Sequence, residues 1–334
     1  MGRIRVNAGA WVFDARAGET LFEALRAQGI AVPSVCGGRG LCGLCRVKVA
    51  EGGGVVQPAE LNRLTDEERA GGLRLSCQVR VDGDIAVEAP PELLRATPSA
   101  GVVERIRDLT HDMKDVRIRL TDPSAMDFKA GQYVEIDVPA VARGDAPVYR
   151  AYSIASPPED AGAIELIIRL VPGGICTTWV FTMLKEGDPV KFNGPYGQFG
   201  LTDTDRPMVW VAGGSGMAPF RGMVRHMKNA GIRRPVTFFF GALAKRDLCL
   251  VDEFRALEKE MPGLTFIPAL SQPAPEDQWD GEAGLITQVV ERHVTDAKDV
   301  EFYLCGSAGM IDASIKVIKG KNVGDDRIFY DKFT

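Results

Sequence analysis

Three cysteines and four glycines fall within CGGRGLCGLC, the stretch from Cys36 to Cys45, and 31 residues separate Cys45 from a fourth cysteine, Cys77. Four thiolates can hold zinc or an iron–sulfur cluster, but structural zinc sites usually take their ligands in paired C-x2-C knuckles. Three ligands on one loop and a distant fourth are typical of plant-type [2Fe–2S] centres, although that pattern has four residues between its first two cysteines where this chain has five. We therefore predict a [2Fe–2S] cluster held by Cys36, Cys42, Cys45 and Cys77, with a zinc knuckle or buried free thiols as the alternatives.

The glycines of this loop suit a cluster better than they suit an ordinary turn. Gly37, Gly38, Gly40 and Gly43 let the backbone curl tightly and point bare amide N–H groups at the cluster sulfurs. Hydrogen bonds of this kind stabilise the reduced, more negative cluster.

Composition and charge narrow the class of protein further. The chain has 334 residues and seven cysteines, and its N-terminal stretch carries scattered charges with no apolar signal region. An odd cysteine count without an export signal favours metal or redox chemistry over disulfides. The missing export signal also leads us to expect a cytoplasmic location. The net charge of −5 and pI of about 5.5 argue against nucleic-acid binding. No apolar run is long enough to span a membrane.

The chain divides into three segments with different periodicities. Residues 1–90 contain a strand hairpin at 3–13 with an Asn-Ala-Gly turn, a helix at 19–29 and the cysteine loop. The proline-rich residues 91–99 are a predicted linker. Residues 100–203 carry short strands separated by Gly, Pro and Asp, with one helix at 177–187, as in an antiparallel barrel or sandwich. Residues 204–334 alternate strand and helix, which predicts a parallel doubly wound sheet.

Two motifs of the middle segment suit a flavin such as FAD. In RAYSIAS (150–156), Arg150 can reach a pyrophosphate, Tyr152 can lie on the isoalloxazine, and Ser153 can hydrogen-bond near its N5. In GGICTTW (173–179), Gly174 permits a turn, and Thr177 and Thr178 with their amides can hold phosphate at a helix N-terminus. A plain strand and ordinary turn chemistry are the alternatives, and the order and spacing of the motifs favour the flavin.

Three motifs of the last segment suit a dinucleotide. GGSGMAP (213–219) has Pro219 where G-x-G-x-x-G has its third glycine, so the Rossmann fingerprint is not met, yet Pro219 suits the first turn of a helix that faces a pyrophosphate. Cys305 and Gly306 end the last predicted strand, at the edge that faces the ligand crevice, although Cys305 can equally be a core cysteine. Arg246 and its neighbour Lys245 can contact a nucleotide 2′-phosphate, or Asp247 can instead accept from a ribose hydroxyl, and we predict a preference for NADH over NADPH. The predicted nucleotide-binding residues are Gly213, Gly214, Gly216, Met217, Pro219, Arg246, Cys305 and Gly306.

These motifs together carry a resemblance to known families. Residues 1–90 resemble a [2Fe–2S] ferredoxin domain of the β-grasp type, and the flavin and nucleotide motifs resemble those of the ferredoxin–NADP reductase superfamily. The cysteine spacing, GALAKRD (241–247) and LSQPAPEDQW (270–279) are similar to the F subunit of the sodium-translocating NADH:quinone oxidoreductases. The resemblance implies that Cys305 lies beside the nicotinamide and that Phe333 covers the flavin. With Tyr152 and Ser153, these are the expected catalytic residues.

One difference from that F subunit bears on the electron acceptor. The F subunit has an N-terminal membrane helix, whereas this chain begins with the ferredoxin-type segment. The same architecture without an anchor resembles the reductase components of phenol, methane and benzoate oxygenases. We therefore expect no direct membrane span.

The resemblance implies a multidomain fold: a β-grasp [2Fe–2S] ferredoxin domain, an antiparallel β-barrel FAD domain and an α/β doubly wound NAD domain. NADH delivers a hydride and the cluster accepts one electron at a time, so FAD must stand between them. We predict an NADH-dependent reductase that passes electrons to a partner redox protein such as an oxygenase component. The alternatives are a subunit of a quinone- or ferredoxin-linked complex, a metalloenzyme activator, or a zinc-stabilised binding module.

Overall fold

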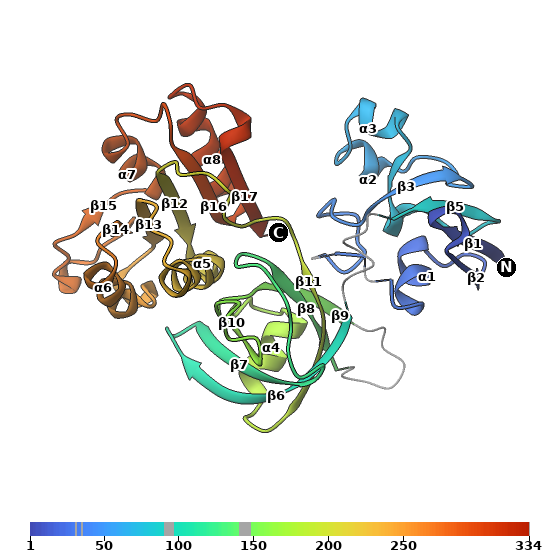
Figure 1. Cartoon of the computed structure of the whole chain (residues 1–334), viewed down its shortest axis with the longest axis horizontal. Coiled ribbons are helices and arrows are strands. Elements are labelled where there is room, and N and C mark those ends of the chain that lie inside the picture. Colours follow the sequence, from blue (N-terminus) through green and yellow to red (C-terminus); the bar gives the residue numbers. More distant parts are fainter. Residues whose placement is uncertain (31, 35, 90–96, 140–147, 334) are drawn as a thin grey trace.

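The computed structural model describes residues 1–333 except 31, 35, 90–96 and 140–147, and it contains three sheets that follow one another along the chain (Figure 1). Each sheet belongs to one of the three predicted segments. Most of the linker expected at 91–99 lies outside the described residues, and strand β6 already begins at Thr97. No helix in the described part of the chain combines the length and apolar character needed to cross a bilayer.

The N-terminal sheet is mixed and packs against one helix, as in a β-grasp fold. Its strand order is β2-β1-β5-β3-β4, with β1 and β5 parallel and the other pairs antiparallel. The predicted helix at 19–29 is α1, which Thr20 and Glu23 cap reciprocally and which buries Leu21, Phe22 and Leu25. The elements are β1 Gly2–Val6, β2 Trp11–Ala15, α1 Leu21–Ala27, β3 Arg46–Glu51, α2 Pro58–Leu61, α3 Asp66–Ala70, β4 Leu73–Leu75 and β5 Ile85–Glu88.

The middle sheet closes into an antiparallel barrel. Its order is β10-β7-β6-β11-β8-β9, and a bridge between Ile154 and Leu166 joins the end of β9 to β10. The helix expected at 177–187 is α4, which begins at Ile175 and ends at Thr182 and buries Val180 in the barrel core. The elements are β6 Thr97–Asp108, β7 Met113–Asp122, β8 Tyr133–Val138, β9 Val148–Ser153, β10 Ala163–Arg169, α4 Ile175–Thr182 and β11 Pro189–Tyr196.

The C-terminal sheet is parallel throughout, in the order β15-β14-β13-β12-β16-β17. The chain runs outward from β12 to β15 and then returns to β16 on the other side of β12, so the strand order reverses there. Ligands of open α/β sheets bind at such a reversal, outside the carboxyl ends of the strands. The elements are β12 Met208–Gly213, α5 Met217–Ala230, β13 Val236–Ala242, α6 Val251–Glu260, β14 Leu264–Leu270, β15 Glu282–Ala283, α7 Ile286–His293, β16 Glu301–Ser307, α8 Ala308–Lys319 and β17 Ile328–Phe333.

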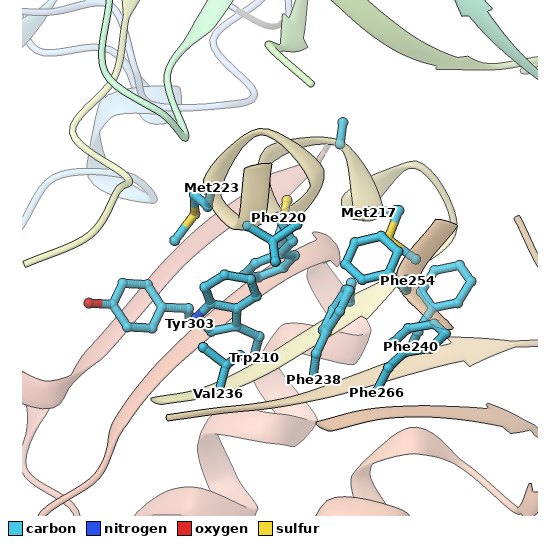
Figure 2. Close-up of a cluster of buried hydrophobic side chains, with 14 of the residues drawn as sticks. Trp210, Met217, Phe220, Met223, Val236, Phe238, Phe240, Phe254, Phe266 and Tyr303 are labelled. Atoms are coloured by element: carbon cyan, nitrogen blue, oxygen red, sulfur yellow. The ribbon is translucent and has the colours of Figure 1, made fainter. Parts of the chain in front are cut away.

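An aromatic cluster anchors α5 on this sheet. The rings of Trp210 and Phe220 stack with centroids 5.2 Å apart, and Phe238 packs against both. Phe254 of α6 and Phe266 of β14 extend the same cluster, as Figure 2 shows. Because all five side chains are fully buried, the beginning of α5 is held firmly at the end of β12.

Strand β17 is absent from the sequence-based prediction, which expected only an aromatic contact near Phe333. The strand pairs with β16, so that Asp331 lies opposite Cys305 and Phe333 lies opposite Ser307. It brings the end of the chain to the carboxyl edge of the sheet. The fold class itself is confirmed in all three domains.

Candidate functional site

The four cysteines of the predicted cluster come together as two pairs. The sulfurs of Cys36 and Cys42 lie 3.4 Å apart, and those of Cys45 and Cys77 lie 3.3 Å apart. Among the described residues, no three His, Cys, Asp or Glu side chains group as a single-ion site requires. Two pairs of thiols suit a [2Fe–2S] cluster, in which each iron takes two protein ligands.

The backbone of the loop directs its amides at these sulfurs. The N–H groups of Leu41 and Cys42 face the sulfur of Cys36, that of Leu44 faces Cys42, and that of Gly40 faces Cys77. The four glycines all have positive φ, and a Cβ on Gly40 would lie 2.8 Å from the side-chain nitrogen of Gln78. A loop of this shape needs glycine, and its amides stabilise negative sulfur.

One thiol of each pair is primed to lose its proton. The hydrogen bond from Cys42 lowers the pKa of Cys36 from 9.0 to about 4, and the bond from Cys45 lowers the pKa of Cys77 to about 7. The same bonds raise the pKa values of the two donors, Cys42 and Cys45. Iron binds thiolate rather than thiol, so the donor set fits the predicted cluster.

A cavity of about 530 Å³ lies where the three domains meet. Its volume is in the range of cofactor pockets. The barrel supplies most of the wall, the C-terminal domain adds Ser215, Ala218 and the end of β17, and the cluster loop adds Arg39. The predicted residues in the wall are Arg150, Tyr152, Ser153, Gly174, Thr177 and Phe333.

Two residues of the cavity wall, Cys176 and Asp331, have no role predicted from the sequence. The hydroxyl of Tyr152 donates to the sulfur of Cys176 over 3.2 Å, and the hydroxyl of Ser153 donates to the carboxylate of Asp331 over 3.4 Å. Burial raises the pKa of Asp331 from 3.8 to about 6, and the bond from Ser153 lowers it in part. Asp331 stands two positions before Phe333 on one strand, which places both on the same face, and this alternation was the available signal.

The loop before α4 partly matches the predicted phosphate site. Gly174 is the N-cap of α4, and the hydroxyl of Thr177 accepts from the amide of Val171, 3.1 Å away, and donates to backbone carbonyls of the loop. Thr177 therefore shapes the loop, while the first amides of α4 remain available for a phosphate. Thr178 is exposed and does not line the cavity.

The predicted nucleotide loop, residues 213–219, reaches the cavity wall through Ser215 and Ala218, whereas the residues predicted to bind the nucleotide lie outside the wall. Gly213, Gly214, Gly216, Met217, Pro219, Cys305 and Gly306 are all absent from the wall. A Cβ on Gly216 would overlap the carbonyl oxygen of Cys305, and the side chain of Cys305 is fully buried. Glycine at position 216 thus lets α5 begin directly beside β16, at the strand-order reversal.

Arg246 lies on a turn away from the cavity. Its side chain is 75% exposed and its Nε is 4.0 Å from the carboxylate of Asp247. That carboxylate accepts from the amide of Ala244 over 2.9 Å, which stabilises the turn after β13. Asp247 therefore has a structural role in the turn, and Arg246 is free to approach a ligand.

The cluster loop and the cavity are in direct contact. Arg39 lines the cavity, and its Nε donates to the carbonyl oxygen of Cys36 over 2.8 Å. On the barrel side, a Cβ on Gly37 would lie 3.0 Å from a guanidinium nitrogen of Arg150. The side chains of Arg39 and Arg150 therefore lie between the cavity and the loop segment that carries the first cluster cysteine, Cys36.

The cysteine loop contacts the cavity of the barrel, and the parallel sheet contributes the end of β17 to the wall of that cavity. This arrangement defines an iron–sulfur flavoprotein reductase. The family models agree along the chain: a 2Fe-2S iron-sulfur cluster binding domain matches residues 4–82, an oxidoreductase FAD-binding domain 100–200 and an oxidoreductase NAD-binding domain 210–316. The chain belongs to the family of NADH-dependent iron–sulfur flavoproteins that includes the F subunit of the Na⁺-translocating NADH–quinone reductases.

Individual relatives support this placement. The chain is 36% identical to the F subunit of the Na⁺-translocating NADH-quinone reductase of Neisseria meningitidis strain MC58, over 95% of this chain and 88% of the relative. The Amycolatopsis cytochrome P-450 reductase GcoB has 32% identity and a TM-score of 0.80 over 100% of this chain and 99% of its own. The ferredoxin reductase in carbazole 1,9a-dioxygenase has 26% identity and a TM-score of 0.75 over 100% and 98%.

The family confirms the predicted activity and cofactors. The protein is an oxidoreductase that moves electrons from NADH through FAD and a [2Fe–2S] cluster to a partner.

Proposed function

We propose that the physiological acceptor is a separate redox protein, such as an oxygenase component, that docks beside the cysteine loop. The observation that carries this is the exposure of the loop. Cys42 is the one partly exposed member of the cluster set, and Leu41 and Leu44 on either side of it are 49% and 40% exposed. Exposed apolar side chains around a partly exposed cluster cysteine suit the apolar centre of a protein–protein contact.

The reductase relatives support this acceptor class. Two of the similar structures are a cytochrome P-450 reductase and a ferredoxin reductase in carbazole 1,9a-dioxygenase. Both cover the whole of this chain, including its ferredoxin domain. We extend from them only the kind of acceptor, a protein that takes single electrons.

The residues of the cavity would bind FAD and orient the hydride donor. Arg150 and the first amides of α4 would hold the pyrophosphate, and Tyr152, whose hydroxyl donates to the sulfur of Cys176, would contact the ring. Ser153 and Asp331 place a hydroxyl and a carboxyl where a proton can be exchanged. Bound FAD supplies the conversion of a hydride into single electrons.

Nucleotide binding would use the edge at the strand-order reversal. Pro219 and Gly216 shape the beginning of α5, where the Met217 amide is bonded within the preceding turn and Pro219 has no N–H, so that the Ala218 amide would be available to a pyrophosphate. Phe333 lines the cavity wall, so a nicotinamide that stacks there would displace its ring. The Cys36, Cys42, Cys45 and Cys77 thiolates would hold the cluster, which would supply one-electron chemistry, and Arg39 contacts both the cluster loop and the cavity.

A charged side chain introduced into the exposed cysteine loop tests the docking proposal. Leu44→Glu should lower NADH-driven reduction of cytochrome c, used as a model acceptor, by about tenfold, and leave ferricyanide reduction by the flavin unchanged. Leu285→Glu is the matched control, because Leu285 is 59% exposed on the C-terminal domain. Equal cytochrome c rates for Leu44→Glu and wild type would refute docking at this face.

The 36% identity to the F subunit of a Na⁺-translocating reductase favours a second candidate, membership of a quinone-linked complex. Co-purification separates the two. An oxygenase component that accepts electrons at a cluster-dependent rate supports the first candidate, and a membrane quinone reductase complex supports the second.

A further inference from the structure

Glu135 is a buried carboxylate of the barrel that faces the ferredoxin domain. It lies on β8 with no exposed surface, opposite Ala151 of β9, which lines the cavity. Its carboxylate accepts from Nη1 of Arg26 over 2.7 Å and from the backbone amide of Ser34 over 2.6 Å. Both donors belong to the ferredoxin domain, so one carboxylate joins the two domains.

Arg26 is enclosed by the same interface. It lies on α1, and its side chain is 9% exposed. Its guanidinium carbon is 3.7 Å from the centroid of the Tyr149 ring, which belongs to β9 of the barrel. A guanidinium that stacks on an aromatic face and pairs with a carboxylate has little freedom to move.

Ser34, whose amide is bonded to Glu135, also forms hydrogen bonds with the cluster loop. Its Oγ accepts from the amide of Gly38 over 2.8 Å and lies 3.7 Å from the sulfur of Cys36. Its carbonyl oxygen accepts from the amide of Gly37 over 3.1 Å. The amide, carbonyl and hydroxyl of this one fully buried residue therefore connect Glu135 to the first cluster cysteine.

We propose that Glu135 is a positioning residue for electron transfer, which clamps the cluster loop against the cavity through Arg26 and Ser34. The proposal rests on the proposed function, because it takes the cavity as the flavin site. Without the carboxylate, the buried Ser34 amide loses its acceptor and the buried guanidinium keeps the long bond to the Val32 carbonyl oxygen, 3.5 Å away, so the interface must open to hydrate both donors. Electron transfer weakens steeply with distance, so a looser loop slows the step from flavin to cluster while hydride transfer is unaffected.

The test replaces the carboxylate by an amide of the same shape. Glu135→Gln keeps one oxygen acceptor, but its NH2 group then faces Arg26 or the Ser34 amide, both of which are donors. The matched control is Glu165→Gln. Glu165 is also buried and pairs with Arg221 and Arg225, at the interface of the barrel with the C-terminal domain.

Two measurements on the full-length, cofactor-loaded protein decide the outcome. For Glu135→Gln we expect wild-type iron and flavin contents and an unchanged ferricyanide rate, with a fall in the cytochrome c rate on the order of tenfold. Amide hydrogen exchange of Gly37 and Gly38 should be faster than in wild type. Glu165→Gln should leave the ratio of the two rates and the exchange of this loop unchanged.

The proposal is overturned by wild-type exchange and an unchanged rate ratio in Glu135→Gln, or by an equal fall of both rates. Arg26→Lys, which keeps the charge and loses the stacking, should give the same pattern as Glu135→Gln and decides the matter if that variant does not fold. If Cys42→Ala reduces cytochrome c as fast as wild type, the exit route of the proposed function fails. The exchange measurement still tests the clamp in that case.

Discussion

Asp331 lies in the cavity wall beside the fully buried Cys305, and its ionisation should destabilise the domain that carries it. Burial raises the pKa of this carboxyl from 3.8 to about 6. The folded protein therefore holds a proton over a pH range in which the unfolded chain has already released it. Stability falls as pH rises from about 4 to about 6 and is constant above that range.

The two pKa values set the size of the effect. A difference of one between folded and unfolded pKa is worth about 1.36 kcal/mol, so 3.8 and about 6 give about 3 kcal/mol at pH 8 and about 1.6 kcal/mol at pH 5. Water in the cavity screens the charge, which makes these values upper bounds. Asp331→Asn keeps the size and removes the charge, and should stabilise the domain by these amounts.

Hydrogen exchange of the amides of β16 and β17, corrected for intrinsic rates, measures this stabilisation. Protection in Asp331→Asn should exceed that of wild type by up to about 15-fold at pH 5 and up to about 150-fold at pH 8. Asp312→Asn is the control, since Asp312 is 63% exposed and paired with Lys332, and it should change protection little. The same ratio of Asp331→Asn to wild-type protection at both pH values would refute the reasoning.

Three further changes test other parts of the site. Cys42→Ala should reduce the iron content from about two atoms per chain to near zero and keep the flavin, and stoichiometric zinc in wild type would contradict the cluster assignment. Phe333→Ala should tighten the apparent affinity for NADH by about two- to tenfold and weaken discrimination against NADPH, because no ring needs displacing, whereas Tyr330→Phe should change neither. Gly216→Ala should cost about 1–3 kcal/mol in urea unfolding because its Cβ overlaps the carbonyl of Cys305. Gly309→Ala, with open space around its Cβ, should not.

The elements and the cluster loop were predictable because their signals are local. The glycines around Cys42 and the alternating pattern after residue 204 follow from backbone sterics and periodicity within short windows. The capped helix at 19–29 is of the same kind. In each case the residues that form the loop, strand or helix are the same neighbouring residues whose pattern predicts it.

The cavity was less predictable because its wall is assembled from residues far apart in the chain. Asp331 and Cys176 acquire their partners, Ser153 and Tyr152, only when β17 and α4 pack beside β9. Strand β17 itself was missed, since one short aromatic segment does not distinguish a strand from loose packing. Thr178 shows the same limit: it is of the same type as its neighbour Thr177, yet it is exposed while Thr177 is buried, and residue type alone does not distinguish the two.

The cavity wall also affects how the protein unfolds. Residues as distant in sequence as Arg39 and Phe333 line it, so a cofactor that fills it would need three domains in place at once. A ligand at about one hundred times its Kd adds about 2.7 kcal/mol against the loss of its site, whichever domain opens first. Flavin loading therefore links three modules into one cooperative unit, and the flavin-free protein should melt domain by domain.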